Sequence, residues 1–225
     1  MPARLRPTAP IAADAILVGD PGRALMLAQE LLQQPKMSNH ARGLWGYTGL
    51  TEEGHELTIQ ATGMGGPSAA VVVADLAELG VRRAIRVGTC TSLGDLEPAD
   101  LLIVTEAQPF RGSLVGTDPT KEPRNEERAD GGLMTDLVEA LPTARRGPVV
   151  SLDSLYRPER DLPPISAEAA DMQTAGLFAG AAEHGVAVAA LLIVFEKSDS
   201  GQLRDEELEE AAKRAGAAAS TVLST

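Results

Sequence analysis

Short apolar runs alternate along the chain with longer segments in which apolar residues recur every three or four positions. The apolar runs fall at residues 15–18, 101–105, 148–151 and 186–195 and predict strands. The periodic segments predict helices at residues 24–34, 67–79, 131–141, 167–184 and 204–223. Strands that alternate with helices favour an α/β fold with a mixed, mostly parallel central sheet and helices on both faces.

One segment has the pattern of a hairpin. Aromatic and small side chains alternate over residues 43–50, and residues 56–62 form an apolar partner across a turn at Glu53 and Gly54. No repeat and no linker interrupts the pattern. We therefore predict that residues 1–225 form a single domain, a size that one sheet with two helical layers commonly reaches.

Composition agrees with a globular protein, since 44% of the residues are hydrophobic and 23% are charged. The longest apolar run, at residues 186–195, is too short to cross a bilayer, and the N-terminal residues lack the pattern of a cleavable signal. Cys90 is the only cysteine, so no intrachain disulfide can form. We expect a cytoplasmic protein without a membrane partner.

The charge balance argues against nucleic acid as a partner. Acidic residues outnumber basic ones 32 to 20, which gives a formal net charge of −12, and aromatic residues make up only 3% of the chain. Binding to phosphate backbones needs a basic surface, and stacking on bases needs aromatic rings. Any anion site must therefore be local and built from individual arginines.

The stretch over residues 82–94 predicts such a site. An apolar strand carries one cation, Arg86, and we expect the strand to end in a turn over residues 88–92. A cation in a buried strand needs an anionic partner, while Gly88 permits close approach and Thr89 offers a hydroxyl at the strand end. The pattern indicates an anion pocket. The alternative is a structural ion pair with an acid near in sequence, Asp75, Glu78 or Asp95.

Two other turns also follow strands. Residues 19–23 read Gly-Asp-Pro-Gly-Arg and place Arg23 in the first turn of a helix, where a cation opposes the helix dipole unless it faces an anion or is solvated. The glycine-rich turn at residues 63–68 lacks the third glycine and the following acid of a dinucleotide site, which excludes NAD. No nucleotide-triphosphatase loop and no metal-ligand spacing occur.

Taken in order, these turns resemble the nucleoside phosphorylase superfamily, specifically the bacterial hexameric purine nucleoside phosphorylases and their uridine phosphorylase relatives. The resemblance is carried first by Gly-Asp-Pro-Gly-Arg at 19–23, Arg-Gly-Leu-Trp-Gly-Tyr-Thr-Gly at 42–49, Gly-Met-Gly-Gly-Pro-Ser at 63–68 and Arg-Val-Gly-Thr at 86–89. In the second half it rests on Ser-Leu-Asp-Ser-Leu-Tyr at 151–156, Asp-Met-Gln-Thr-Ala at 171–175 and Ser-Asp at 198–199.

This resemblance implies the phosphorolysis of a purine (deoxy)ribonucleoside, a pentosyl transfer of purine salvage, with inorganic phosphate as co-substrate and no cofactor. By the same resemblance, phosphate would be bound by Gly19, Arg23, Arg86, Thr89 and, from a neighbouring subunit, Arg42. Met64 and Met172 would pack on the ribose, and Gln173 would bond its hydroxyls. The nucleoside site would also include Cys90, Thr91, Leu155, Asp171 and Ser198. Asp199 would donate a proton to the purine N7, supported by Arg214 in preference to Arg204.

Several positions depart from the family pattern. The family usually has a glutamate at position 173, a longer acid at position 171, a glycine at position 91 and an aromatic residue at position 155, and its purine enzymes carry a histidine near the N-terminus. These departures keep alternatives open: a uridine phosphorylase, a nucleosidase that uses water, or a non-catalytic protein that binds a nucleoside or phosphate. The resemblance also implies a homo-oligomer, at least a dimer, with a hexamer built as a trimer of dimers.

Overall fold

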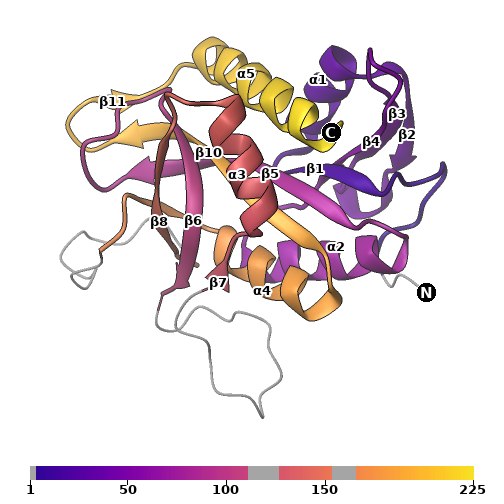
Figure 1. The fold of residues 1–225 in the computed structure, drawn as a ribbon, viewed down its shortest axis with the longest axis horizontal. Helices are drawn as coiled ribbons and strands as arrows, with labels where there is room; N and C mark the ends of the chain where they lie inside the picture. The colour runs from indigo at the N-terminus through magenta and orange to yellow at the C-terminus, as the bar shows by residue number, and fades with distance from the viewer. Residues whose placement is uncertain (1–3, 111–126, 154–165) are drawn as a thin grey trace.

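The strands form one mixed sheet with helices packed on both of its faces (Figure 1). The computed structural model describes residues 4–110, 127–153 and 166–225. Within these ranges the strands are β1 Asp14–Val18, β2 Gln33–Asn39, β3 Gly46–Leu50, β4 Glu56–Ala61, β5 Arg83–Ser92, β6 Leu101–Pro109, β7 Glu127–Arg128, β8 Arg145–Ser151, β9 Ala169–Asp171, β10 Ala187–Lys197 and β11 Gly201–Gln202. The helices are α1 Pro21–Leu31, α2 Gly66–Glu78, α3 Gly131–Ala140, α4 Thr174–His184 and α5 Asp205–Leu223, with a short 3-10 turn, η1, at Ala41–Gly43.

Part of the sheet closes into a ring of strand pairings. The long strand β5 pairs with β1 near its start and with β9 near its end, while β10 runs parallel along its other edge. From β10 the pairing continues through β6 and β8 and returns to β5 through β9. On the other side, β1, β4, β3 and β2 extend the sheet outward, and β2 forms its edge. The ring brings the ends of β5 and β9 together.

The sheet separates two layers of helices. Helices α1, α3 and α5 cover one face, and α2 and α4 cover the other (Figure 1). Strand β1 shows why, because its side chains alternate: Ile16 joins the core beneath α1 and α5, whereas Leu17 joins the core beneath α2 and α4. None of the helices in the described residues is long and apolar enough to cross a membrane.

The predicted α/β class with helices on both faces is confirmed. The parallel part of the sheet is smaller than expected, since β2, β3 and β4 pair with one another antiparallel, as do β6 with β10 and β5 with β9. The hairpin at residues 43–62 is confirmed as β3 and β4.

Two boundaries were predicted wrongly and one strand was missed. The turn expected at residues 88–92 is strand, because β10 pairs with β5 as far as Thr91. The helix expected from residue 167 begins at Thr174, since residues 169–171 pair with β5 and β8 as strand β9. The polar edge strand β2, which contains Pro35, has no apolar pattern and was missed.

Candidate functional site

A cavity of about 410 Å³ opens where β1, β4 and β5 run toward the starts of α1, α2 and α4. The carboxyl ends of parallel strands commonly form the ligand crevice of such sheets. The cavity is lined by Gly19, Asp20, Pro21 and Arg23 before and in α1, by Gly63, Met64 and Gly65 before α2, by Arg86, Gly88 and Thr89 on β5, and by Met172 and Gln173 before α4. Met64 is 81% exposed, so its thioether is free to cover a ligand.

The first turn of α1 supplies a partly buried cation, Arg23. The Asp20 carboxylate caps the helix by accepting a hydrogen bond from the backbone N–H of Arg23 (2.8 Å), and Pro21 takes a first-turn position. Burial lowers the pKa of the Arg23 guanidinium, Asp20 opposes this shift, and the nearby Arg86 adds to it. Two guanidinium groups that face one cavity favour an anion between them.

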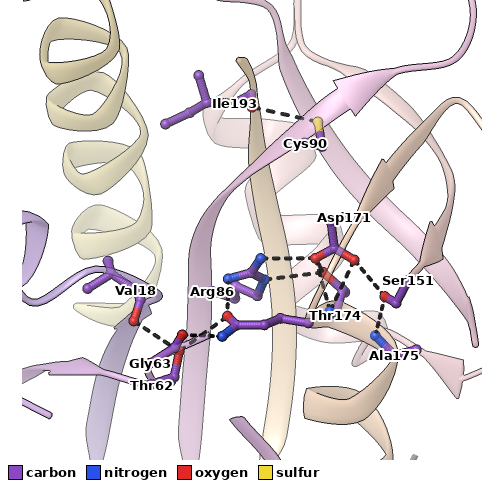
Figure 2. A network of polar contacts seen from close by, with 11 residues as sticks. Val18, Thr62, Gly63, Arg86, Cys90, Ser151, Asp171, Thr174, Ala175 and Ile193 are labelled. Atoms are coloured by element: carbon purple, nitrogen blue, oxygen red, sulfur yellow. Dashed lines mark hydrogen bonds and ion pairs between the residues drawn. The ribbon is translucent and has the colours of Figure 1, made fainter. Parts of the chain in front are cut away.

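Arg86 is buried, with 5% of its surface exposed, and is held by α4 and the residues before it. Its Nη2 lies 2.9 Å from an Asp171 oxygen, Nη1 donates to Gln173 Oε1 (2.8 Å), and Nε donates to Thr174 Oγ1 (3.2 Å) (Figure 2). The counter-charge is therefore Asp171, and none of the acids near in sequence. Within the described residues these bonds use one N–H of each guanidinium nitrogen. Nη1 and Nη2 each carry a second N–H that could donate to a ligand.

Asp171 stabilises this arrangement from behind the cavity. It accepts hydrogen bonds from the backbone N–H and the hydroxyl of Thr174 and from the Ser151 hydroxyl, which in turn accepts the N–H of Ala175 (Figure 2). A carboxylate at the start of α4 is also favoured by the helix dipole. Asp171 does not line the cavity, so the structure places it as the support of Arg86.

Gln173 connects three of the turns that form the cavity. Its Oε1 accepts hydrogen bonds from Arg86 and from the Thr62 hydroxyl (3.2 Å), and its Nε2 donates to the Gly63 carbonyl. Only 4% of the residue is exposed. The expected partners were ribose hydroxyls, but the carbonyl oxygen of this amide is already bonded twice within the protein.

Two close approaches depend on glycine. A Cβ at Gly88 would stand 2.5 Å from Cζ of Arg86, so the guanidinium can lie where it does only over a glycine. A Cβ at Gly176 would stand 2.7 Å from Cα of Gly66, where the first turns of α2 and α4 touch. Sequence reasoning assigned Gly88 to the approach of a ligand and did not single out Gly66 and Gly176 for this contact.

Besides Asp171, three expected nucleoside-binding residues of the described chain lie outside this cavity. Cys90 is buried in the core, its Sγ faces the Ile193 carbonyl (3.6 Å) (Figure 2), and burial raises the pKa of its thiol far above the ordinary value. Thr91 donates to Glu196 (2.8 Å). Ser198 is exposed beyond the end of β10. Leu155 lies outside the described residues.

The expected acid, Asp199, lies at the tip of the hairpin formed by β10 and β11, and its side chain is 77% exposed. Glu97 holds this hairpin, because it accepts hydrogen bonds from Lys197 Nζ (2.6 Å) and from the Ser200 hydroxyl (2.9 Å). Asp199 does not line the cavity.

The expected pairing of Asp199 with an arginine is not found in the described part of the chain. Arg214 donates to the Ala99 carbonyl (3.0 Å), and Arg204 pairs with Glu207 (2.8 Å) at the start of α5. Both arginines thus have other partners, which a local sequence pattern cannot reveal. Arg42 lines a separate cavity.

No group of three or more histidine, cysteine, aspartate or glutamate side chains in the described ranges is arranged to hold a metal ion. The fold and the cavity define an α/β protein that gathers arginine side chains and helix N-termini at its strand ends, an arrangement suited to a small anion. Residues 14–225 match the sequence profile of the phosphorylase superfamily, and the chain belongs to that family.

Individual relatives agree with this assignment. The chain is 31% identical over 209 residues to a purine nucleoside phosphorylase DeoD-type of Caldanaerobacter subterraneus subsp. tengcongensis, which covers 88% of each chain. It is 33% identical over 205 residues to a protein of the same description from Bacillus cereus, covering 85% of each. The fold is similar to that of the purine nucleoside phosphorylase from Toxoplasma gondii solved in complex with immucillin-H, with a TM-score of 0.80, 20% identity and coverage of 96% and 93% of the two chains.

Proposed function

We propose that this protein is a purine nucleoside phosphorylase, which converts a purine (deoxy)ribonucleoside and inorganic phosphate to the free base and (deoxy)ribose 1-phosphate without a cofactor. The observation that carries the proposal is that residues expected for phosphate and residues expected for the sugar line one cavity, although they come from separate segments of the chain: Gly19, Arg23, Arg86 and Thr89, and Met64, Met172 and Gln173. The descriptions of the relatives support the substrate class.

The chemistry of phosphorolysis fits the charges in the cavity. As the glycosidic bond breaks, the sugar becomes cationic and the base becomes anionic, so the protein must hold phosphate against the sugar. Arg23 and the unused donors of Arg86 would hold the phosphate oxygens, with Thr89 adding a hydroxyl. Since Asp171 neutralises Arg86 and Asp20 partly offsets Arg23, phosphate binding would depend on directed N–H donors more than on a large net charge.

The leaving base needs a proton, and Asp199 remains the proposed donor. Its exposed position means that the hairpin of β10 and β11 has to move toward the cavity, which requires Glu97 to release Lys197 and Ser200. Arg214 supports Asp199 in this proposal only if it gives up its bond to the Ala99 carbonyl.

We also propose a homo-oligomer, with a dimer as the smallest active unit and a hexamer as the expected assembly. Arg42 and Arg86 of one chain line different cavities. Arg42 would therefore bind phosphate only in the site of a second copy.

A second candidate is a non-catalytic protein that binds phosphate or a nucleoside. It is favoured by the neutralisation of Arg86 by Asp171 and by the internal bonds of Gln173, both of which would weaken substrate binding. Phosphate-induced stabilisation without turnover of any nucleoside would support this candidate.

The test is base release from inosine, adenosine, guanosine and uridine, measured with and without inorganic phosphate. Phosphate-dependent release of a purine base that is lost in Arg86→Ala and kept in Arg82→Ala would support the proposal. Arg82 is an exposed arginine whose side chain, within the described residues, bonds carbonyls of nearby residues, so it controls for loss of charge. Arg86→Ala leaves the buried Asp171 carboxylate without its ion-pair partner and is expected to lower stability. Thermal unfolding is therefore measured for this variant, and the milder Arg86→Lys is tested in parallel.

The remaining outcomes assign the alternatives. Release from uridine alone would indicate a uridine phosphorylase, and release without phosphate would indicate a nucleosidase. Asp199→Asn changes an exposed side chain, so a loss of turnover with unchanged thermal stability would support its role as the proton donor.

A further inference from the structure

The part of the Arg86 cavity that would receive the sugar is poor in hydrogen-bond acceptors. It is lined by Met64, Met172 and Gln173. Thioether sulfur is a weak acceptor, so the two methionines offer a sugar mainly apolar contact. Within the described residues, the strong polar atoms that a sugar meets on this side therefore belong to the Gln173 side chain.

The orientation of the Gln173 amide is fixed by its neighbours. Arg86 can only donate, so its Nη1 faces the amide oxygen Oε1 (2.8 Å), and the Gly63 carbonyl can only accept, so it faces the amide nitrogen Nε2. Exchanging the two amide atoms would set donor against donor and acceptor against acceptor. Because only 4% of the residue is exposed, the side chain also has little room to turn.

The acceptor capacity of this amide is already used inside the protein. Besides Arg86, Oε1 faces the Thr62 hydroxyl (3.2 Å), which shares its one proton between Oε1 and the Val18 carbonyl (3.0 Å). A carbonyl oxygen has two lone pairs, and both are directed at these neighbours. An amide nitrogen carries two N–H groups, of which one donates to Gly63. Gln173 thus has one N–H to offer a ligand and no free acceptor.

No carboxylate among the described residues lines the sugar side of the cavity. Asp20 lines the cavity, but it accepts the backbone N–H of Arg23 (2.8 Å), and its charge acts on the Arg23 guanidinium, so it belongs to the phosphate half. Asp171 is held behind the cavity by Arg86 and Thr174. A sugar hydroxyl bound beside Gln173 therefore meets no charged acceptor from the described chain.

We propose that this site selects 2′-deoxyribonucleosides over ribonucleosides, an inference that rests on the proposed function and narrows its substrate class. A ribonucleoside brings hydroxyl groups at both C2′ and C3′, and each has a proton that needs an acceptor once it leaves water. The one free N–H of Gln173 can bond the oxygen of a single hydroxyl, and a 2′-deoxyribonucleoside supplies only the 3′-hydroxyl there. Its C2′ methylene group can pack on Met64 and Met172, where a 2′-hydroxyl would lose its hydrogen bonds to water.

The proposed reaction favours the same class of sugar. A 2′-hydroxyl withdraws electrons from C1′ and makes the cationic sugar of the transition state harder to form. A protein that acts on ribonucleosides compensates for this effect with hydrogen bonds that strengthen in the transition state. Because the Gln173 amide has no free acceptor, it cannot take the proton of a 2′-hydroxyl and gives no such compensation.

The experiment measures the Kd of inosine, adenosine and their 2′-deoxy analogues for the full-length protein by isothermal titration calorimetry without phosphate. The proposed phosphorolysis needs phosphate, so the greater lability of deoxynucleosides does not enter these values. We expect the 2′-deoxy analogue of the preferred base to bind about tenfold to a hundredfold more tightly, the range in which a mainly apolar pocket rejects an added hydroxyl.

Two variants assign the selectivity to residue 173. Gln173→Glu places a carboxylate with free lone pairs beside the sugar and should bring the two Kd values together, mainly by tightening the ribonucleoside. Gln33→Glu makes the same chemical change at an exposed position of β2 and should leave their ratio unaltered. Thermal unfolding checks both variants. The ratio for the unaltered protein stands by itself if Gln173→Glu does not fold.

The inference is overturned if the unaltered protein binds each ribonucleoside as tightly as its 2′-deoxy analogue, or if it binds none of the four nucleosides. Base release with phosphate is measured on the same four compounds. Phosphate-dependent release without preference for deoxynucleosides would leave the phosphorylase standing and remove this selectivity. Selective binding of deoxynucleosides without any base release would refute the phosphorylase and keep the selectivity.

Discussion

The guanidinium group of Arg86 lies over the Cα of Gly88, two positions further along β5. A Cβ at position 88 would stand 2.5 Å from Cζ and 2.6 and 2.7 Å from the terminal nitrogens. Residues two apart on a strand project from the same face, so any side chain at position 88 displaces the guanidinium group. The position of the buried cation is thus set by the absence of a side chain at a neighbouring position.

Gly88→Ala is therefore expected to push Arg86 away from Asp171. Overpacking of this kind costs about 1–3 kcal/mol of unfolding free energy, and we expect phosphate to stabilise the variant less than the unaltered protein. Thermal unfolding with and without phosphate measures both effects. Gly131→Ala is the control, since a Cβ there meets open space. Equal phosphate-induced shifts in the two variants would contradict the prediction.

Asp171→Asn keeps the shape of the side chain and removes its charge. A buried arginine left without its counter-charge destabilises a protein by about 3–5 kcal/mol, so the free energy of unfolding without phosphate should fall. The unpaired guanidinium then attracts phosphate more strongly, and the stabilisation produced by phosphate should increase. Chemical denaturation at several phosphate concentrations tests this, and a smaller phosphate effect than in the unaltered protein would refute it.

Gln173→Glu restores the residue that is usual in the family. A carboxylate cannot donate to the Gly63 carbonyl, so this bond is replaced by repulsion, and a loss of about 1–3 kcal/mol in stability is expected. The same carboxylate would bind ribose hydroxyls more strongly, which should lower KM for a ribonucleoside relative to its 2′-deoxy analogue. The ratio of the two KM values, measured beside the unfolding free energy, checks both parts. An unchanged ratio would mean that residue 173 does not contact the sugar.

Glu97→Gln is expected to release the hairpin that carries Asp199. Hydrogen bonds from Lys197 and Ser200 lower the pKa of Glu97. The stability that the Glu97 carboxylate gives to the hairpin is therefore present above its ordinary pKa and is lost as the pH falls through the lowered value. Glu97 likewise raises the pKa of Lys197, so the stability that the Lys197 ammonium group gives to the hairpin is lost as the pH rises through the raised value. At neutral pH both groups are charged and the hairpin is held.

Hydrogen exchange of the amides around residues 198–202 should accelerate in Glu97→Gln, and kcat should rise if release of the hairpin limits turnover. Glu209→Gln is the control, because it removes an exposed ion pair with Lys213 on α5, away from the hairpin. Equal exchange rates in the two variants at neutral pH would show that Glu97 does not hold the hairpin.

Local sequence patterns predicted much of this architecture. The motifs at residues 19–23, 63–68 and 86–89 each occupy a short strand-to-helix turn or strand end, and they line one cavity as expected. The errors arise where a distant partner decides the structure. The polar run at 88–92 reads as a turn, but it is strand because β10 pairs with it. The partner of Arg86 lies 85 residues away, and the contacts of Arg214 depend on where α5 packs, so neither can be read from a local pattern.

The ring of strand pairings also bears on how the protein folds. Arg86 on β5 and Asp171 at the end of β9 are 85 residues apart in the chain. The β5–β9 pairing that joins them belongs to a ring that also contains β6, β8 and β10, and such long-range pairings form slowly. Because the cavity needs four separate segments of the chain in place at once, we expect its phosphate half to be incomplete in the folding transition state. Contacts absent from the transition state change the unfolding rate alone, so bound phosphate should slow unfolding and leave the refolding rate unchanged. The ligand would then act mainly to lengthen the lifetime of the folded state.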